Sequence, residues 1–395
     1  MKRLMILCSI ILLVGLFNGC KNPIDGRSEI DKIMFVTVFG IDSIASDNDS
    51  VKITLTSPMV TQAQEEGSQG NTDFHVITSQ GKSVFEAIRN TLFFTDKRVF
   101  LGHVGYIIIG EDAAKKDIAN LLDFFTRDHE IRLNSEVLVV KGQTAEELIK
   151  SMRGDKELLF EQLENIQANI AGVSKSGRVE LIELMKSIDN VWSVHYIPYI
   201  TCDMNTSYPE LRSEGKNIYL EGYGIFKDAR LYGYIMNDLA RGLNWTINEV
   251  ESGYIHTKTE EGSNITMEII NSHAEILPYL DNEDLSVTIK VRMTTNIVEI
   301  DSGEDVFNEK KLTFLENQQS QIVRSEINSI IDYAQTAKAD IFDVGNAIHH
   351  KYPIKWKSIE GEWEQLFPSI PFNIIVESSI SRTYNITKPS KYRRR

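Results

Sequence analysis

Cys20 is the residue of this chain whose chemistry is most specific. The basic residues Lys2 and Arg3 precede an almost wholly apolar stretch, residues 4–17, and Gly19 stands directly before the cysteine. This layout is typical of a secretory signal, because the apolar stretch is shorter than the roughly 20 residues that span a bilayer as a helix. It predicts a bacterial lipoprotein, in which the Cys20 thiol receives a diacylglyceryl group and becomes the N-terminus after cleavage. An ordinary cleaved signal that leaves Cys20 as a free thiol is the alternative.

A second candidate site is the cluster of charges at Arg127, Asp128, Glu130 and Arg132. It lies between an expected helix and an expected strand. Such a corner can bind the charges of a partner protein, or its members can pair with one another at the helix end and the turn. The sequence is compatible with both interpretations.

The common catalytic and cofactor motifs are absent from the sequence. Gly222 and Gly224 lack the third glycine of a dinucleotide fingerprint and lie in a strand pattern. No phosphate-binding loop, Gly-x-Ser-x-Gly elbow or His-Glu-x-x-His pair occurs. His349 and His350 would diverge by about 100° on a helix, and no motif supplies a nucleophile for His103. We therefore expect no enzyme, no cofactor and no metal site.

The charge of the chain limits its partners. Its formal net charge is -14, and loss of Lys2 and Arg3 with the leader gives -16, from 40 basic and 56 acidic residues. An acidic body of this kind argues against nucleic acid as a partner. Anionic headgroups also repel it, so we expect the lipid on Cys20 to provide the attachment to a membrane.

The three cysteines exclude an internal disulfide in the mature chain. Cys8 leaves with the leader, Cys20 is acylated, and Cys202 has no remaining partner. Cys202 follows the apolar run 194–200, so we expect a buried structural thiol rather than a nucleophile.

Hydrophobic patterns predict an α+β fold, with mixed or antiparallel sheets and packed helices. In the first half we expect strands at residues 33–39, 51–55, 99–109 and 132–140, a mobile loop at 61–73, and helices at 83–94, 114–125, 159–170 and 181–188. Thr144 to Glu147 has the pattern of a capping box and opens a further helix. In the second half we expect a hairpin at 218–234 that turns at Lys227 and Asp228, a long strand at 285–294, helices at 309–337, 341–349 and 359–367, and a strand at 372–380.

These elements fall into at least two domains. The polar segment 206–216, with Pro209 and Gly215, is the predicted linker. The predicted division is a signal peptide at 1–19, a membrane tether at 20–30, an N-terminal domain at 31–205, the linker at 206–216, a C-terminal domain at 217–387 and a basic tail at 388–395.

With its elements in this order, the chain resembles the spore germination lipoprotein family Ger(x)C, the C subunit of germinant receptors. The resemblance rests on short motifs that follow one another through both expected domains. They are residues 39–42 (Phe-Gly-Ile-Asp), 84–89, 101–104, 127–134, 222–227 and 340–345, with Trp363 and Phe367 near the end.

The resemblance implies a non-catalytic protein on the outer face of the spore's inner membrane, held by the lipid on Cys20. It implies two membrane partners, an A subunit and a B subunit similar to amino-acid transporters. Together such subunits sense small nutrients and trigger the release of ions and dipicolinate.

Two other classes of protein would also be tethered. A solute-binding lipoprotein of a transporter should show two α/β lobes of repeated strand–helix units, and the long alternating strands after Gly215 argue against that arrangement. A tethered hydrolase would need a convergent catalytic set of residues, which the sequence does not indicate.

Overall fold

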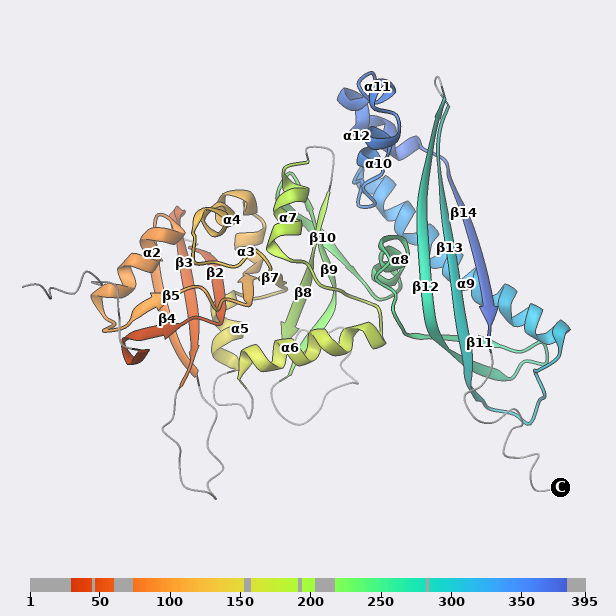
Figure 1. Cartoon of the computed structure of the whole chain (residues 1–395), viewed down its shortest axis with the longest axis horizontal. Helices are drawn as coiled ribbons and strands as arrows, with labels where there is room; N and C mark the ends of the chain where they lie inside the picture. Colours follow the sequence, from red (N-terminus) through yellow and green to blue (C-terminus); the bar gives the residue numbers. More distant parts are fainter. Residues whose placement is uncertain are drawn as a thin grey trace, which may run out of the picture.

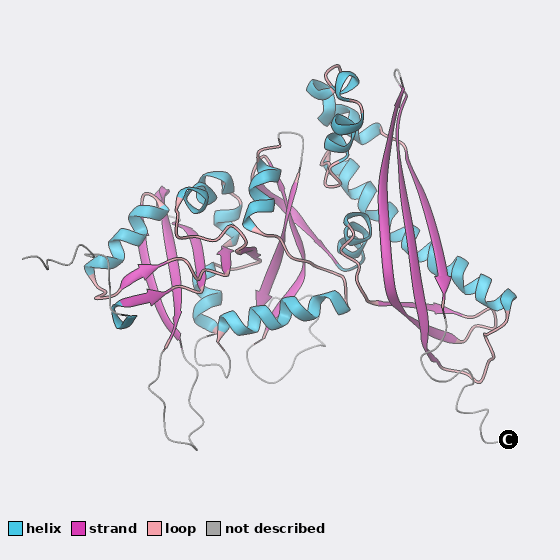
Figure 2. Cartoon of the chain, viewed as in Figure 1, coloured by secondary structure: helices cyan, strands magenta, loops and turns pink. Residues whose placement is uncertain are grey.

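A computed structural model describes residues 30–44, 47–59, 74–152, 158–190, 194–202, 217–281 and 284–381. The predicted leader 1–19, Cys20, the loop 61–73, the linker 206–216 and the basic tail 388–395 lie outside the described residues. Figures 1 and 2 show helices packed on two separate large sheets, each with mixed strand directions. The predicted α+β fold with mixed sheets is confirmed.

An eight-stranded sheet organises the first half of the chain, in the order β10-β9-β8-β7-β6-β2-β3-β4. The inner strands β2, β6, β7 and β8 pair in parallel, and the outer strands pair antiparallel at both edges. The strands are β2 (Val38–Ile44), β3 (Asp47–Pro58), β4 (Phe74–Gly81), β6 (Tyr106–Ile109), β7 (Glu136–Val140), β8 (His195–Cys202), β9 (Ile218–Lys227) and β10 (Arg230–Met236).

Helices cover both faces of this sheet. Phe39 and Ile107 belong to the core beneath one set of helices, whereas their neighbours Val38 and Ile108 belong to the core on the opposite face. Successive side chains of a strand point to opposite faces, so strands buried on both sides appear as continuous apolar runs. The first face carries α2 (Val84–Asn90), α3 (Glu111–Ala114), α4 (Ile118–Arg127) and α7 (Leu181–Ile188), and the second carries α5 (Ala145–Ser151) and α6 (Leu159–Asn169).

A four-stranded sheet with long strands organises the second half, in the order β11-β12-β13-β14. Val287, Ile289 and Val291 of β13 are buried in one core with Val323 and Ile327 of α9, which confirms the predicted half-buried strand and the long helix. The elements are β11 (Tyr254–Lys258), β12 (Asn264–Asp281), β13 (Asp284–Ile300), β14 (Phe372–Ile380), α8 (Asn237–Ile247), α9 (Glu309–Ala337), α10 (Val344–Lys351), α11 (Pro353–Trp356) and α12 (Trp363–Leu366).

Two predicted strands are each divided in the structure. The run 33–39 forms β1 (Ile33–Phe35) and the beginning of β2, and the run 99–109 forms β5 (Arg98–Phe100) and β6. The second break is a turn in which Val104 N donates to Leu101 O at 3.1 Å. β1 and β5 pair with each other in a separate two-stranded parallel sheet.

Other predicted boundaries also differ. The strand predicted at 132–140 begins only at Glu136, because Ser135 N donates to Arg132 O at 3.1 Å in a turn. The helix predicted at 341–349 begins at Val344, and the helix predicted at 359–367 is the short α12 between two 3-10 turns, η6 (Glu360–Glu362) and η7 (Phe367–Ser369).

The eight-stranded sheet continues past the predicted linker. The predicted hairpin is confirmed as β9 and β10, and its turn holds Asp228 and Ala229 at φ 49° and 56°. β9 pairs with β8, so this hairpin adds the last two strands to the sheet of the first half. The division of the chain into domains at 206–216 therefore does not coincide with the division between the two sheets.

Asp42 and Thr144 together fix the start of α5. The predicted capping box is confirmed: Thr144 Oγ1 accepts from Glu147 N at 3.1 Å, and Glu147 Oε2 accepts from Thr144 N at 3.0 Å. The buried Asp42 carboxylate accepts further hydrogen bonds from Ala145 N at 2.7 Å and Glu146 N at 2.9 Å. A carboxylate at the positive end of a helix satisfies N–H groups that have no partner within the helix.

Asp340 has the same role at the start of α10. Its carboxylate accepts hydrogen bonds from Val344 N at 3.0 Å, Gly345 N at 2.7 Å and Trp363 Nε1 at 3.2 Å. Burial raises the pKa of Asp340 to about 6. A Cβ atom on Gly345 would lie 2.9 Å from Trp363 Nε1, so the glycine lets α10 approach the indole.

A buried ion pair joins α8 to α9. Arg241 Nε donates to Glu326 Oε2 at 2.9 Å, Arg241 Nη2 contacts Glu326 Oε1, and both side chains are less than a tenth exposed. Trp245 Nε1 donates to Glu326 Oε2 at 2.8 Å, and Arg241 Nη1 donates to Tyr254 O at 3.0 Å. The two helices approach so closely here that a Cβ atom on Gly242 would lie 2.4 Å from Glu326 O.

Candidate functional site

The predicted cluster at 127–132 forms the corner between α4 and β7. Arg127 is the last residue of α4, and its Nε lies 2.6 Å from Asp123 Oδ2, one turn earlier in the helix. Asp128 is the C-terminal cap of α4, and its Oδ1 accepts a hydrogen bond from Glu130 N at 2.8 Å. Arg127 and Arg132 are exposed, so they face solvent at this corner.

Glu130 ties the corner to β5 and to the turn that follows it. Its carboxylate pairs with Arg98 and accepts a hydrogen bond from Leu101 N at 3.2 Å. From the other side of the turn, Ser135 Oγ donates to Val104 O at 2.6 Å. The charged side chains of this corner thus form ion pairs and turn hydrogen bonds within the protein, as the second of the two interpretations from the sequence expects. Contact of the exposed arginines with a partner stays a prediction.

His103 and Cys202, which were also considered from the sequence, contact aromatic rings and a glutamine side chain. The ring of His103 lies edge-on to Phe35, with centroids 5.2 Å apart, and is tilted against Phe100 at 5.6 Å. Cys202 ends β8 and is only half-buried, with Sγ 3.6 Å from Gln143 Oε1, so its thiol is less buried than predicted. The apolar run before Cys202 is buried, but the strand ends at the cysteine itself.

The two adjacent histidines lie at the end of α10. The rings of His349 and His350 are stacked, with centroids 5.8 Å apart. Within the part of the chain that the structure describes, no three His, Cys, Asp or Glu side chains are grouped as a metal ion would require.

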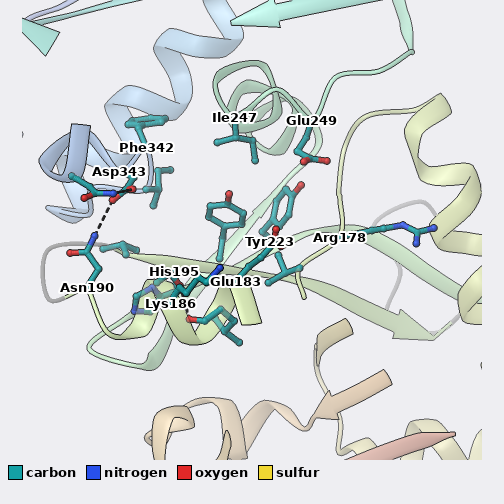
Figure 3. Close-up of a pocket in the computed structure, with 17 residues that line it drawn as sticks. Arg178, Glu183, Lys186, Asn190, His195, Tyr223, Ile247, Glu249, Phe342 and Asp343 are labelled. Atoms are coloured by element: carbon teal, nitrogen blue, oxygen red, sulfur yellow. Dashed lines mark hydrogen bonds between the residues drawn. The ribbon is translucent and has the colours of Figure 1, made fainter. Parts of the chain in front are cut away.

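A cavity of about 540 Å³ lies where the two halves of the molecule meet. Residues of α7, β8 and β9 line it from the first half, and the end of α8 and the segment before α10 line it from the second (Figure 3). The polar and charged groups around it include Glu183, Lys186, Asn190, His195, Glu249 and Asp343.

Hydrogen bonds between the two halves border this cavity. Asn190 Nδ2 donates to Asp343 Oδ1 at 3.3 Å, shown as the dashed line in Figure 3. Val194 N donates to Asp340 O at 3.4 Å on the same side. Asp340 therefore has two roles: its carboxylate holds the start of α10, and its backbone oxygen contacts the first half of the molecule.

His195 is the first residue of β8 and is 5% exposed. Its Nδ1 is buried and has no hydrogen-bond partner among the described residues. Burial lowers the pKa of His195 to about 4, against the opposing effect of the Asp343 charge, so the imidazole is neutral at pH 7. Among the residues that the structure describes, no carboxylate orients the ring through Nδ1, as one does for the general base of a serine hydrolase.

On the other side of the cavity, the pKa of Glu249 is also shifted from its ordinary value. Burial raises the pKa of Glu249, and the charges of Glu251 and Glu183 raise it further. Tyr223 donates its hydroxyl hydrogen to Asn244 Oδ1 at 2.7 Å. The cavity therefore offers charged and hydrogen-bonding groups for binding or for contact between the halves.

No pattern in the sequence indicated this cavity. The one signal available was His195, a polar residue near the start of the apolar run 194–200, and it was not singled out from the sequence. Glu183 and Glu249 belong to different elements, and only the approach of the two halves brings them to the same space.

Two family models match the chain one after the other. The model described as the spore germination protein N-terminal domain matches residues 26–202. The model described as spore germination B3/GerAC like, C-terminal, matches residues 221–384. The chain belongs to the GerAC-like family of spore germination proteins. The family resemblance predicted from the short motifs is confirmed.

Relatives of this GerAC-like chain are similar over nearly their whole length. Spore germination protein B3 of Bacillus subtilis (strain 168) is 23% identical over 357 residues, which are 89% of this chain and 91% of that protein. Spore germination protein A3 of the same organism is 21% identical over 369 residues, 92% of each chain. The crystal structure of the GerBC protein has the same fold, with a TM-score of 0.57 and 19% identity over 87% of this chain and 96% of that one.

Several motifs that carry the GerAC-like resemblance have structural roles in this chain. Asp42 closes the Gly-Ile-Asp motif and starts α5, Asp340 starts α10, and Glu130 holds the turn after β5. Across the described ranges, no helix is long and apolar enough to cross a bilayer.

His195 should make the stability of this GerAC-like protein sensitive to acid. Its folded pKa of about 4 lies below the ordinary value of about 6.5, so the unfolded chain binds more protons between these values. The contribution of the neutral His195 to the free energy of unfolding is fully present above about pH 6.5 and is lost as the pH falls from there through 4. We expect the free energy of unfolding to drop by about 2 kcal/mol from this group at pH 5, measured by urea unfolding.

His195→Gln should remove this part of the pH dependence, because a glutamine does not titrate. His256→Gln is the matched control, since His256 is exposed on β11. Equal slopes of stability against pH for the wild type and His195→Gln would contradict the assignment.

Proposed function

We propose that this protein is the C subunit of a nutrient germinant receptor, without catalytic activity of its own. The observation that carries the proposal is the succession of both GerAC-like family models, in order, over most of the chain. In this role the protein is held on the outer face of the spore's inner membrane by diacylglyceryl on Cys20. It assembles there with a membrane A subunit and a transporter-like B subunit.

The physical properties of the chain support this role. A body with a net charge of -14 has no general attraction to anionic headgroups, so an acyl anchor and membrane-embedded partners must keep it at the bilayer. The exposed Arg127 and Arg132 at the corner between α4 and β7 are candidate contacts to those partners.

The alternative of a solute-binding lipoprotein has less support. In the described part of the chain, the first half has helices on both faces of a mixed sheet with a parallel centre and antiparallel edges. The second half is a long sheet with α8 and α9 packed in its single core. The two halves are therefore not a pair of similar α/β lobes. Calorimetric titration of the mature chain with amino acids and sugars tests this alternative, because tight one-to-one binding without partners would favour it.

Deletion of the gene in the spore-forming host tests the proposal. We expect deletion spores, in a strain without paralogous receptors, to lose the response to at least one nutrient, and a wild-type copy to restore it. Normal responses to every nutrient in that strain would contradict the proposed function. The matched control is a deletion strain complemented with Cys202→Ala, because Cys202 is outside the proposed anchor.

A further inference from the structure

Three consecutive apolar side chains project from the end of α2. Leu92, Phe93 and Phe94 are 55%, 87% and 60% exposed, and they lie in and just after the 3-10 turn η2 (Thr91–Phe93). We refer to these three residues as the apolar tip. Single exposed apolar residues are ordinary on a protein surface, but a contiguous group of large ones marks a site of interaction.

The apolar tip lies at the end of the molecule where the described chain begins. β1 and β5 are parallel, with Ile33 opposite Arg98, so the segments that lead into them approach from the same side. The first of these segments is the turn η1 (Ile30–Lys32), in which Ile30 is 76% exposed, and the second follows the apolar tip. Figure 1 shows the beginning of the described chain, in red, at the same end as α2.

This end is also the one that follows the proposed anchor along the chain. Ile30 is ten positions after Cys20, and a fully extended chain of that length spans at most about 35 Å. An acylated Cys20 therefore keeps Ile30 within that distance of the lipid, at the same end of the molecule as α2 and the apolar tip.

The charges around the apolar tip differ in sign from those of the whole protein. Residues 82–98 contain four basic side chains and two acidic ones, a net charge of +2 in a chain of -14; the basic ones are Lys82, Arg89, Lys97 and Arg98. Glu130 pairs with Arg98, and counting it leaves a net charge of +1. The Arg89 guanidinium lies 5.0 Å from the ring of Phe85, a further half-exposed aromatic on α2. Basic residues beside exposed aromatic ones are the composition of a segment that lies in a membrane interface.

We propose that the apolar tip inserts into the boundary between headgroups and acyl chains, as a second membrane contact beside the anchor. Two contacts at one end fix the orientation of the body, which a single flexible tether cannot do. A side chain as exposed as Phe93 suits insertion into a soft lipid phase rather than seating on a flat protein surface. The inference rests on the proposed anchoring at Cys20, because the anchor brings this end to the bilayer.

Tryptophan fluorescence in vesicles tests the insertion. Phe93→Trp is placed in the lipidated full chain, which is reconstituted into phosphatidylglycerol–phosphatidylethanolamine vesicles with brominated acyl chains. Ile354→Trp is the matched control, because Ile354 is 86% exposed on α11 in the other half of the molecule. Spectra are compared with the parent chain, whose Trp245, Trp356 and Trp363 are buried.

We expect the emission of Trp at position 93 to shift to the blue and to be quenched by the brominated chains, and that of Trp at position 354 to do neither. Emission from position 93 that stays solvent-exposed and unquenched would overturn the proposal. Protection of position 93 only when membrane partner subunits are added would also overturn it, since the apolar tip would then contact protein.

A second experiment separates this proposal from the proposed anchor. In the Cys20→Ala chain, changing Leu92, Phe93 and Phe94 to serine should weaken binding to the same vesicles by about tenfold or more, since burial of one such side chain contributes at least that factor. Ile354→Ser should leave binding unchanged. Equal binding with and without the apolar tip would overturn the insertion. Equal membrane binding of wild type and Cys20→Ala would instead count against the anchor.

Discussion

Cys20→Ala is expected to move the protein from the membrane fraction to the soluble fraction and to impair nutrient germination. Alanine has no thiol to receive diacylglyceryl, so the chain loses both acyl chains at once. Each buried CH₂ group contributes about 0.8 kcal/mol, and two chains convert marginal binding into stable anchoring. The acidic body does not compensate, because anionic headgroups repel it. Fractionation with immunoblotting measures the first effect, and the response of spores to nutrients measures the second.

Cys202→Ala is the matched control for this prediction. Cys202 is the other cysteine of the mature chain, and it lies half-buried at the end of β8. We expect the Cys202→Ala protein to stay in the membrane fraction. A Cys20→Ala protein that also stays there would show that partner contacts or the apolar tip suffice, and the central role of the lipid would be wrong.

Glu326→Ala is expected to lower the free energy of unfolding by about 3–5 kcal/mol, because it leaves a buried charge without its partner. Arg241 and Trp245 both donate hydrogen bonds to the Glu326 carboxylate between α8 and α9. Without that carboxylate, the Arg241 guanidinium keeps its hydrogen bond to Tyr254 O but loses its buried counter-charge, and the Trp245 indole N–H stays buried and unsatisfied. Urea unfolding monitored by circular dichroism measures the change.

Two further variants show whether the loss comes from the buried charge. Glu377→Ala removes an exposed ion pair between Glu377 of β14 and Lys290 of β13. We expect this change to lower the free energy of unfolding by less than about 1 kcal/mol. The double change Arg241→Met with Glu326→Leu removes both charges and should cost less than Glu326→Ala alone. A Glu326→Ala protein as stable as Glu377→Ala would contradict this account of the α8–α9 contact.

Long periodic segments of the sequence predicted their structures well. The helix at 309–337 and the alternating strand at 285–294 depend on a side-chain period that is set locally, and both agree with the structure. The capping box at Thr144 and the turn of the β9–β10 hairpin are also local patterns. The order of short motifs was enough to recognise the family.

Predictions failed where distant contacts decide the local structure. The run 99–109 is mostly apolar, yet Glu130 and Ser135 hold a turn in its middle, around Gly102 and His103. α8 was not predicted, because its buried residues include Arg241 and Asn244, which obscure the apolar face. The cavity at the contact between the halves depends on residues as far apart in sequence as His195 and Asp343, so no local pattern indicates it.

Copurification from spore membranes tests the central claim most directly. The chain is tagged at its C-terminus, the inner membrane is solubilised in mild detergent, and proteins retained with the tag are identified by mass spectrometry. A receptor C subunit should retain an A-type subunit and a transporter-like B-type subunit, in amounts comparable to its own. Recovery of the tagged protein without either membrane subunit, from spores that still respond to nutrients, would contradict the proposal that it is a receptor subunit.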